Sequence, residues 1–297
     1  MKDIGFFMED ERFLKAYDLI NKSLVELKMD RTYNSIGSNV FFQFGKEKEI
    51  IFKNGRKDVK KEWNIWIGIT SWRITKNDEF IVGSGDSPKM MQAGIEDLLG
   101  LRFQSFLFLS QFLDAEFNFE NGYQITTFFN WMEENQWTIF LPNNSEIYVD
   151  CPSKKEIENV QNIASQFQIK ENYEELISPV QGKVIHEISY DKKTMPIFCF
   201  EDKFSIDLKT CAWRLEKDNR YVVGCRDDDF EKADSELLQL VGKKLQRIDI
   251  ANSMMDARFQ FEDGFTLKTF SCCHIKEQWK IYKGKELVFS GVLPHLT

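Results

Sequence analysis

Histidine is scarce in this chain of 297 residues, which contains only His186, His274 and His295. General acid–base catalysis near neutral pH often uses histidine, so the chain offers few candidates for that role. The six cysteines include no C-x-x-C pair and show no spacing typical of a zinc site. Cys272 and Cys273, which precede His274, are interpreted as small, partly buried strand residues, because no nearby motif supplies further ligands. We therefore expect no metal ion and no cofactor.

Long apolar runs and common catalytic motifs are also missing. No apolar run reaches the roughly 18 residues of a membrane helix, and the N-terminal segment turns acidic at residues 9–11, where a signal peptide would stay apolar. We expect a soluble, cytoplasmic protein with no membrane partner and with reduced thiols. The chain contains no P-loop, no dinucleotide-binding glycine motif, no H-E-x-x-H and no G-x-S-x-G. These absences favour a non-enzymatic protein.

Positive charge is in deficit, since 39 basic and 47 acidic residues give a formal net charge of −8. Nucleic-acid binders obtain much of their affinity from Lys and Arg on phosphates, so we expect no nucleic-acid partner. A negative surface would instead steer a basic protein partner. The charge is unequally divided: residues 1–150 carry 17 basic and 23 acidic side chains, and residues 151–297 carry 22 and 24.

An internal repeat is the main feature that the sequence does contain. Residues 71–83 read SWRITKNDEFIVG and residues 212–224 read AWRLEKDNRYVVG, at a constant offset of 141. Further along, residues 114–122 (DAEFNFENG) match residues 256–264 (DARFQFEDG) at an offset of 142. Matches in the same order at nearly one spacing predict a tandem duplication.

Each predicted unit, residues 1–150 and residues 151–297, is expected to have an α+β fold. An apolar stripe at steps of three and four predicts a leading amphipathic helix, at about 9–28 and again at 154–168. Alternating segments separated by Asn-Gly or Asp-Gly predict hairpins, and hence an antiparallel meander or half-barrel sheet of about seven to nine strands. One inserted helix is expected between residues 83 and 100 and at the equivalent place in the second unit.

Several residues are retained in both units. Two tryptophans per unit are expected in the core, namely Trp72 and Trp137, with Trp213 and Trp279. Asp114 and Asp256, which precede a strand, are expected to be turn or cap residues.

An arginine and an aspartate are retained as well, and their role stays open. They are Arg73 and Asp86 in the first unit, and Arg214 and Asp227 in the second. One reading is a buried pair that positions the inserted helix. The alternative is a pocket between the units that binds a small ligand or carries catalysis, since ligands often sit in clefts of two-domain proteins.

One loop differs strongly between the two units. Residues 129–135 read FNWMEEN, whereas the corresponding residues 271–277 read SCCHIKE. A Trp and a Met beside two Glu match the anchor and rim of a binding surface, although an ordinary surface loop with one core-facing Trp would have the same composition. The residues expected to contact a partner are Trp131, Met132, Glu133 and Glu134.

The repeated pattern resembles that of uncharacterised small bacterial β-rich domains, some of which are immunity proteins of polymorphic toxin systems. In the second unit the pattern consists of Trp213, Arg214, Gly224, Asp227, Leu240, Gly242, Phe259, Phe261, Asp263, Gly264, Trp279 and Ile281. The resemblance covers most of both units. It implies a cytoplasmic bacterial protein without catalytic residues that binds and neutralises a toxin. A small-ligand-binding protein or enzyme, and a scaffold that forms homo-oligomers, are the alternatives.

Overall fold

The structure is a computed structural model. It describes the following residues: 11–51, 55, 57–110, 112, 114–130, 136–142, 146–149, 173–191, 195–226, 230–250, 255–274 and 277–292.

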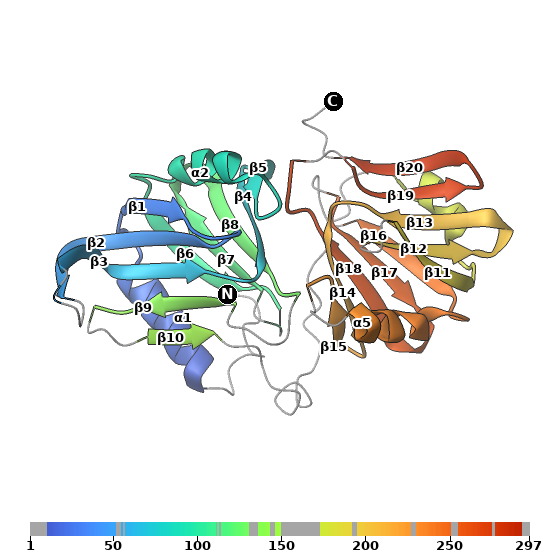
Figure 1. The fold of residues 1–297 in the computed structure, drawn as a ribbon, viewed down its shortest axis with the longest axis horizontal. Coiled ribbons are helices and arrows are strands. Elements are labelled where there is room, and N and C mark those ends of the chain that lie inside the picture. The colour runs from blue at the N-terminus through green and yellow to red at the C-terminus, as the bar shows by residue number, and fades with distance from the viewer. Residues whose placement is uncertain are drawn as a thin grey trace. The chain divides into compact units, whose positions relative to one another are not determined.

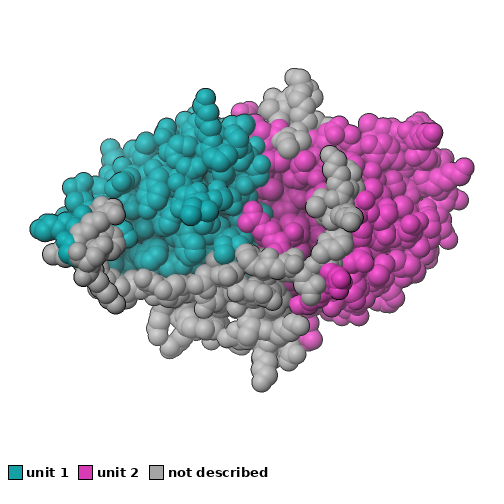
Figure 2. All heavy atoms as spheres, viewed as in Figure 1, with its two compact units in different colours: residues 1–77, 81–129, 133–163 teal, residues 78–80, 130–132, 164–297 magenta. Residues whose placement is uncertain are grey.

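The chain divides into two compact units, which Figure 2 colours separately. Unit 1 consists of residues 1–77, 81–129 and 133–163, and unit 2 of residues 78–80, 130–132 and 164–297. The main division follows residue 163, which lies outside the described residues. The boundary expected at residue 150 stays a prediction.

Unit 1 contains two five-stranded antiparallel sheets (Figure 1). The first sheet has the order β1-β2-β3-β9-β10 and the second has the order β5-β4-β8-β7-β6. The strands are β1 (Met29–Asn34), β2 (Val40–Ile51), β3 (Lys57–Ile67), β4 (Ser71–Lys76), β5 (Glu79–Gly83), β6 (Phe103–Phe108), β7 (Ala115–Phe119), β8 (Tyr123–Phe128), β9 (Trp137–Phe140) and β10 (Glu146–Val149). The helices are α1 (Glu11–Ser23), α2 (Pro88–Glu96) and the 3₁₀ turn η1 (Glu120–Gly122).

Unit 2 has the same two strand orders, β11-β12-β13-β19-β20 for its first sheet and β15-β14-β18-β17-β16 for its second. The strands are β11 (Ile185–Asp191), β12 (Met195–Phe200), β13 (Phe204–Leu208), β14 (Ala212–Lys217), β15 (Arg220–Gly224), β16 (Leu245–Ile250), β17 (Ala257–Phe261), β18 (Phe265–Phe270), β19 (Glu277–Lys283) and β20 (Glu286–Val292). The helices are α4 (Glu174–Ile177) and α5 (Phe230–Leu237), with 3₁₀ turns η2 (Ser178–Val180), η3 (Glu201–Lys203), η4 (Leu238–Leu240) and η5 (Glu262–Gly264).

The expected α+β class is wrong, because strands dominate the described residues and their four α-helices have at most 13 residues each. Each unit has two sheets rather than one meander or half-barrel. Two sheets that pack face to face bury each other's apolar side, so no layer of helices is required. None of the helices in the described part of the chain is long and apolar enough to span a membrane.

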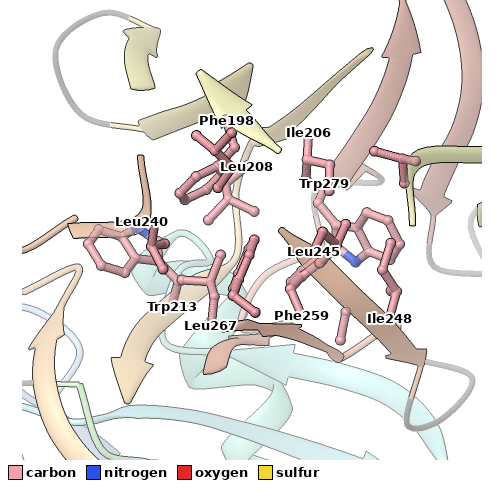
Figure 3. Packing of buried hydrophobic residues seen from close by; sticks show 14 of the residues in the cluster. Phe198, Ile206, Leu208, Trp213, Leu240, Leu245, Ile248, Phe259, Leu267 and Trp279 are labelled. Atoms are coloured by element: carbon pink, nitrogen blue, oxygen red, sulfur yellow. The ribbon is translucent and has the colours of Figure 1, made fainter. Parts of the chain in front are cut away.

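Side chains from both sheets form the apolar core of each unit. In unit 2, Phe198 and Ile206 of the first sheet and Phe259 and Leu267 of the second belong to one buried cluster (Figure 3). The tryptophans predicted to be core residues have exposed fractions of 3% or less, which confirms that prediction. The hairpin predicted at residues 116–128 is also confirmed, as β7 and β8.

The helix predicted between residues 83 and 100 is confirmed as α2. Pro88 begins the helix, and the Ser87 hydroxyl accepts a hydrogen bond from the backbone N–H of Met90 at 3.4 Å. After the helix, Gly100 has a φ of +80° and its N–H donates to the Met29 carbonyl at 2.8 Å. Gly242 makes the same bond to Ile185 at 2.8 Å. In each unit this bond connects the segment that leads into the second sheet with the edge strand of the first sheet, β1 or β11.

The two units differ in the length of one hairpin. Met29 and Ile185, the first paired residues of β1 and β11, lie 156 positions apart, whereas Ile65 and Ile206 lie 141 apart. The β2–β3 hairpin is therefore 15 residues longer than β12–β13. Before β11 the structure places the short α4, at the position that α1 occupies before β1. The second leading helix, predicted at 154–168 from an offset of 140, lies outside the described residues.

Asp114 and Asp256 are buried and hold the backbone where the chain leaves β8 and β18. The Oδ1 of Asp114 accepts the N–H of Phe129 at 2.6 Å. The Oδ1 of Asp256 accepts the N–H of Ser271 at 2.8 Å. A carboxylate that accepts a buried N–H is a structural residue, because leaving a buried donor without an acceptor costs free energy.

The substitution Asp256→Ala is expected to lower the free energy of unfolding by about 2 kcal/mol, because it removes a charged acceptor from a buried N–H. Denaturant unfolding monitored by circular dichroism measures the change. The exposed Glu286 on β20 provides the control, since Glu286→Ala should leave the denaturation midpoint almost unchanged. Equal stability of the two variants would contradict the structural role of Asp256.

Candidate functional site in unit 1

A row of aromatic side chains crosses the outer face of the first sheet of unit 1. On β2, Phe42 and Phe44 point into the core, so Phe41 and Gln43 lie on the opposite face. Phe41 is the cross-strand neighbour of Tyr33 on β1 and of Trp66 on β3. We call Tyr33, Phe41 and Trp66 the aromatic row.

The rings of the aromatic row are stacked and partly exposed. The ring centroids of Tyr33 and Phe41 are 4.7 Å apart with an interplanar angle of 13°, and those of Phe41 and Trp66 are 6.3 Å apart at 21°. The Arg31 guanidinium carbon lies 5.9 Å from the Tyr33 centroid, within cation–π range. A Cβ on Gly68 would lie 2.7 Å from the Trp66 ring, so this glycine lets the indole lie close to the backbone.

Buried polar side chains stand next to the aromatic row. Gln43 and Asn64 are cross-strand neighbours, and Thr138 is the neighbour of Trp66 on β9. Their exposed fractions are 1%, 6% and 0%. Within the described part of the chain, Gln43 Oε1, Asn64 Oδ1 and Thr138 Oγ1 have no hydrogen-bond partner. Buried polar atoms are nearly always paired in proteins, so three such oxygens without a partner on one face are unusual.

Unit 2 lacks the aromatic row at the same register. Its first sheet has the same bulge at the start of the first hairpin, between Ile185 and Glu187, as unit 1 has between Met29 and Arg31. The strand register places Ser189 where unit 1 has Tyr33. In the same way Ile197 stands where unit 1 has Phe41, and Asp207 stands where unit 1 has Trp66. The aromatic row is therefore a property of unit 1 and is not needed to form this sheet.

The outer face of the first sheet of unit 2 carries an open groove of about 440 Å³ instead. Its lining includes His186, Cys199, Ser205, Asp207 and Tyr282. The Ser205 hydroxyl donates a hydrogen bond to Asp207 Oδ1 at 2.9 Å, so this carboxylate oxygen already has a partner within the protein. Burial raises the pKa of the Cys199 thiol. A nucleophilic cysteine has a lowered pKa, so the groove does not present an activated thiol.

The four residues predicted to contact a partner, Trp131, Met132, Glu133 and Glu134, lie outside the described residues. In the chain they come between β8, which ends at Phe128, and β9, which begins at Trp137. The assignment of these residues to a partner surface stays a prediction.

The four residues of the predicted pocket are described only in part. Arg73 on β4 and Arg214 on β14 are buried, with exposed fractions of 4% and 1%. The Asp86 carboxylate accepts the N–H of Gly83 at 2.9 Å, so it helps to shape the turn after β5. Asp227 lies outside the described residues. The pocket itself stays a prediction.

Arg214 belongs to a buried charged group that sequence reasoning did not assign. Its Nε lies 2.7 Å from Glu216 Oε1, and Lys268 Nζ lies 2.9 Å from Glu216 Oε2. Burial by itself would raise the pKa of Glu216, but Lys268 and Arg214 hold this pKa below its ordinary value. A depressed pKa in the folded state means that the ionised carboxylate stabilises the fold.

The aromatic row was missed for a reason that lies in the sequence. The repeat was found at offsets of 141 and 142, whereas β1 and β2 match unit 2 only at 156. The signal that could have found it is the outward position of Phe41, between the inward Val40 and Phe42. An alignment of the two units at the offset of 156 would then have shown that Phe41 in unit 1 corresponds to Ile197 in unit 2.

We expect acidification to remove a stabilising contribution of Glu216. This contribution is complete above the unfolded pKa of about 4.3 and is lost as the pH falls through the lower folded pKa. Glu216→Gln should cost about 3–5 kcal/mol at pH 7, because it leaves buried cations without their carboxylate.

Denaturant unfolding of wild type and Glu216→Gln at pH 7 and at acidic pH measures this contribution. The variant should show a weaker dependence on pH than wild type, whereas the exposed control Glu286→Gln should follow wild type. The assignment fails if Glu216→Gln unfolds at the wild-type denaturant concentration at pH 7.

Comparison with known proteins gives no relative from which a role could be taken. No family model matches the chain, and no curated protein and no solved structure is similar to it. The resemblance to immunity proteins is therefore untested, and the candidate site depends on the geometry of the aromatic row alone.

Proposed function

We propose that this protein is a non-enzymatic binding protein that holds a partner protein on the outer face of the first sheet of unit 1. The observation that carries this proposal is the aromatic row with Arg31 beside it. Trp, Tyr and Arg are the residue types most enriched at the energetic centres of protein interfaces. Here all three types occur on one sheet face, where Tyr33 and Trp66 each stack on Phe41 and Arg31 lies over Tyr33.

The stacking supports the proposal through pre-organisation. A ring that is held between its neighbours loses little conformational freedom when a partner covers it, so more of the gain from burial appears as affinity. The close approach of Trp66 to Gly68 limits the freedom of the indole in the same way. The row therefore offers aromatic contacts at a low entropic cost of binding. A partner that presents apolar side chains to the rings of the aromatic row fits this surface best.

We also propose that the chain is a tandem duplication in which unit 1 acquired this surface. The identical strand orders, the matching bulges and the equivalent bonds of Asp114 and Asp256 support a common origin. Neutralisation of a toxin, which the resemblance implies, would be one form of such binding. The net charge of −8 favours a basic partner.

The test is recovery of a partner by the immobilised full chain from an extract of the source cells, followed by affinity measurement with the purified partner. Trp66→Ala and Tyr33→Ser should each weaken binding by about 2 kcal/mol, or roughly thirtyfold. Serine is chosen because unit 2 has Ser189 at the position of Tyr33. Ile197→Ala, at the position of unit 2 that corresponds to Phe41, is the matched control and should bind as wild type does.

Circular dichroism and thermal unfolding of each variant separate loss of binding from loss of folding. The proposal is wrong if folded Trp66→Ala and Tyr33→Ser bind the recovered partner with wild-type affinity. It is also wrong if no protein is retained by the wild-type chain.

A further inference from the structure

The groove on the outer face of the first sheet of unit 2 is lined by shorter side chains than the same face of unit 1. Cys199 and Ser205, cross-strand neighbours on β12 and β13, both line it. The same register positions of unit 1 hold the longer Gln43 and Asn64. Shorter side chains leave space above the sheet, and the volume of about 440 Å³ lies in the range of small-molecule sites.

The 3₁₀ turn η3, at one end of the groove, has two equivalents in the described part of the chain. Residues 198–204 read FCFEDKF, residues 259–265 read FQFEDGF and residues 117–123 read FNFENGY. In each segment the fourth to sixth residues form a 3₁₀ turn between two paired antiparallel strands, η3, η5 and η1 respectively. The three turns therefore differ mainly in their last residue, which is a lysine in η3 and a glycine in the other two.

Lys203, the last residue of η3, has a backbone conformation that favours glycine. Its φ is +65°, and the equivalent Gly264 and Gly122 both have a φ of +75°. A side chain with a Cβ is disfavoured in this left-handed region, so the lysine costs stability that a glycine would not. Strained residues of this kind occur preferentially at functional sites. The strain makes Lys203 a candidate for a binding role.

The residue that faces this turn differs together with Lys203. In the η5 turn, the Gly264 carbonyl accepts the N–H of Asp218 at 2.9 Å, and a Cβ on Gly264 would collide with the Asp218 carboxylate. In the η3 turn, the Lys203 carbonyl accepts the N–H of Gly284 at 2.7 Å, and Gly284 has no side chain that would meet the lysine Cβ. Compared with η5, this corner has thus lost a carboxylate and gained a cation.

Two basic side chains at this end of the groove are available to a ligand. Lys203 and His186 both line the groove and are exposed. Within the described part of the chain, neither side chain has a hydrogen-bond or ion-pair partner. The lysine ammonium carries a full positive charge and three donors, and the imidazole can donate a hydrogen bond in its neutral and in its protonated form.

The carboxylates near these two side chains already have partners. Asp207, which lines the groove, accepts the Ser205 hydroxyl at Oδ1, and its Oδ2 lies 3.4 Å from Lys209 Nζ. Asp202, the neighbour of Lys203 in the turn, forms an ion pair with Lys183. An anion that enters the groove therefore meets a free cation, whereas the carboxylates beside it are neutralised.

We propose that this groove binds a small molecule in which an oxyanion group, a carboxylate or a phosphate, is attached to an apolar body. Lys203 and His186 contact the oxyanion through charge-assisted hydrogen bonds. The apolar body packs against Ile197 and the Tyr282 ring, which line the same groove. The site lies in unit 2 and does not depend on the protein-binding surface proposed for unit 1.

Isothermal titration calorimetry of the full chain tests the site with three probes that share one apolar body: 2-naphthyl phosphate, 2-naphthoate and the uncharged 2-naphthol. Wild type should bind at least one of the two anions saturably, and at least about tenfold more tightly than 2-naphthol, because only the anions can pair with Lys203.

Lys203→Gly is the most informative variant, since it introduces the residue of the equivalent turns. It removes the cation together with the backbone strain, so anion binding should weaken by at least about tenfold while the denaturation midpoint stays close to or above that of wild type. Lys203→Arg keeps the charge and should bind within about threefold of wild type. Lys232→Ala removes an exposed lysine of α5 that does not line the groove, and this control should bind as wild type does.

The probes also distinguish the source of the oxyanion. Binding of 2-naphthyl phosphate alone supports a phosphorylated ligand, binding of 2-naphthoate alone supports a carboxylate ligand, and binding of both supports the shared chemistry. Failure of wild type to bind either anion, or equal affinity for 2-naphthol, would overturn the proposal. Wild-type affinity of Lys203→Gly, shown to be folded by circular dichroism, would overturn it as well.

Discussion

The packing of one sheet against the other within each unit is the interaction on which the rest of the structure depends. In unit 1 the ring centroid of Trp137 lies 5.3 Å from that of Phe106 and 5.6 Å from that of Phe117, and both phenylalanines belong to the other sheet. In unit 2 the Trp279 ring lies 5.2 Å from Phe259 in the same way. Such aromatic contacts bury a large apolar area and fix the two sheets relative to each other. This apolar packing uses one face of each sheet.

Because the core uses only one face of each sheet, the outer faces are free to differ. Antiparallel sheets tolerate one polar or solvated face, and alternate residues along a strand can change without touching the core. The first sheets show this most clearly, since Trp66 in unit 1 corresponds to Asp207 in unit 2 while Ile65 and Ile206 remain equivalent core residues. A difference such as the aromatic row of unit 1 can therefore arise without disturbing the core.

The sequence allowed local structure to be predicted better than topology. The alternation around residues 116–128 and the turn at Asn121, with a φ of +61°, identify a hairpin because its period and its turn residues are local signals. The division into two sheets was not predicted, because it depends on pairs such as Ile65 with Ile139 that are distant in the chain. The candidate site was missed for a related reason. Because the β2–β3 hairpin is longer, Phe41 precedes its counterpart Ile197 by 156 positions, whereas the repeat was found at offsets of 141 and 142.

Retention of a residue in both units does not by itself show what that residue does. Arg73 and Arg214 are the same residue on equivalent strands, and both are buried. Beside Arg73 the neighbouring strand provides Thr126, whereas beside Arg214 it provides Lys268, and position 216 provides the glutamate that holds both cations. Retention of the arginine therefore reflects its buried place in the fold, whereas the charged groups around it differ between the two units.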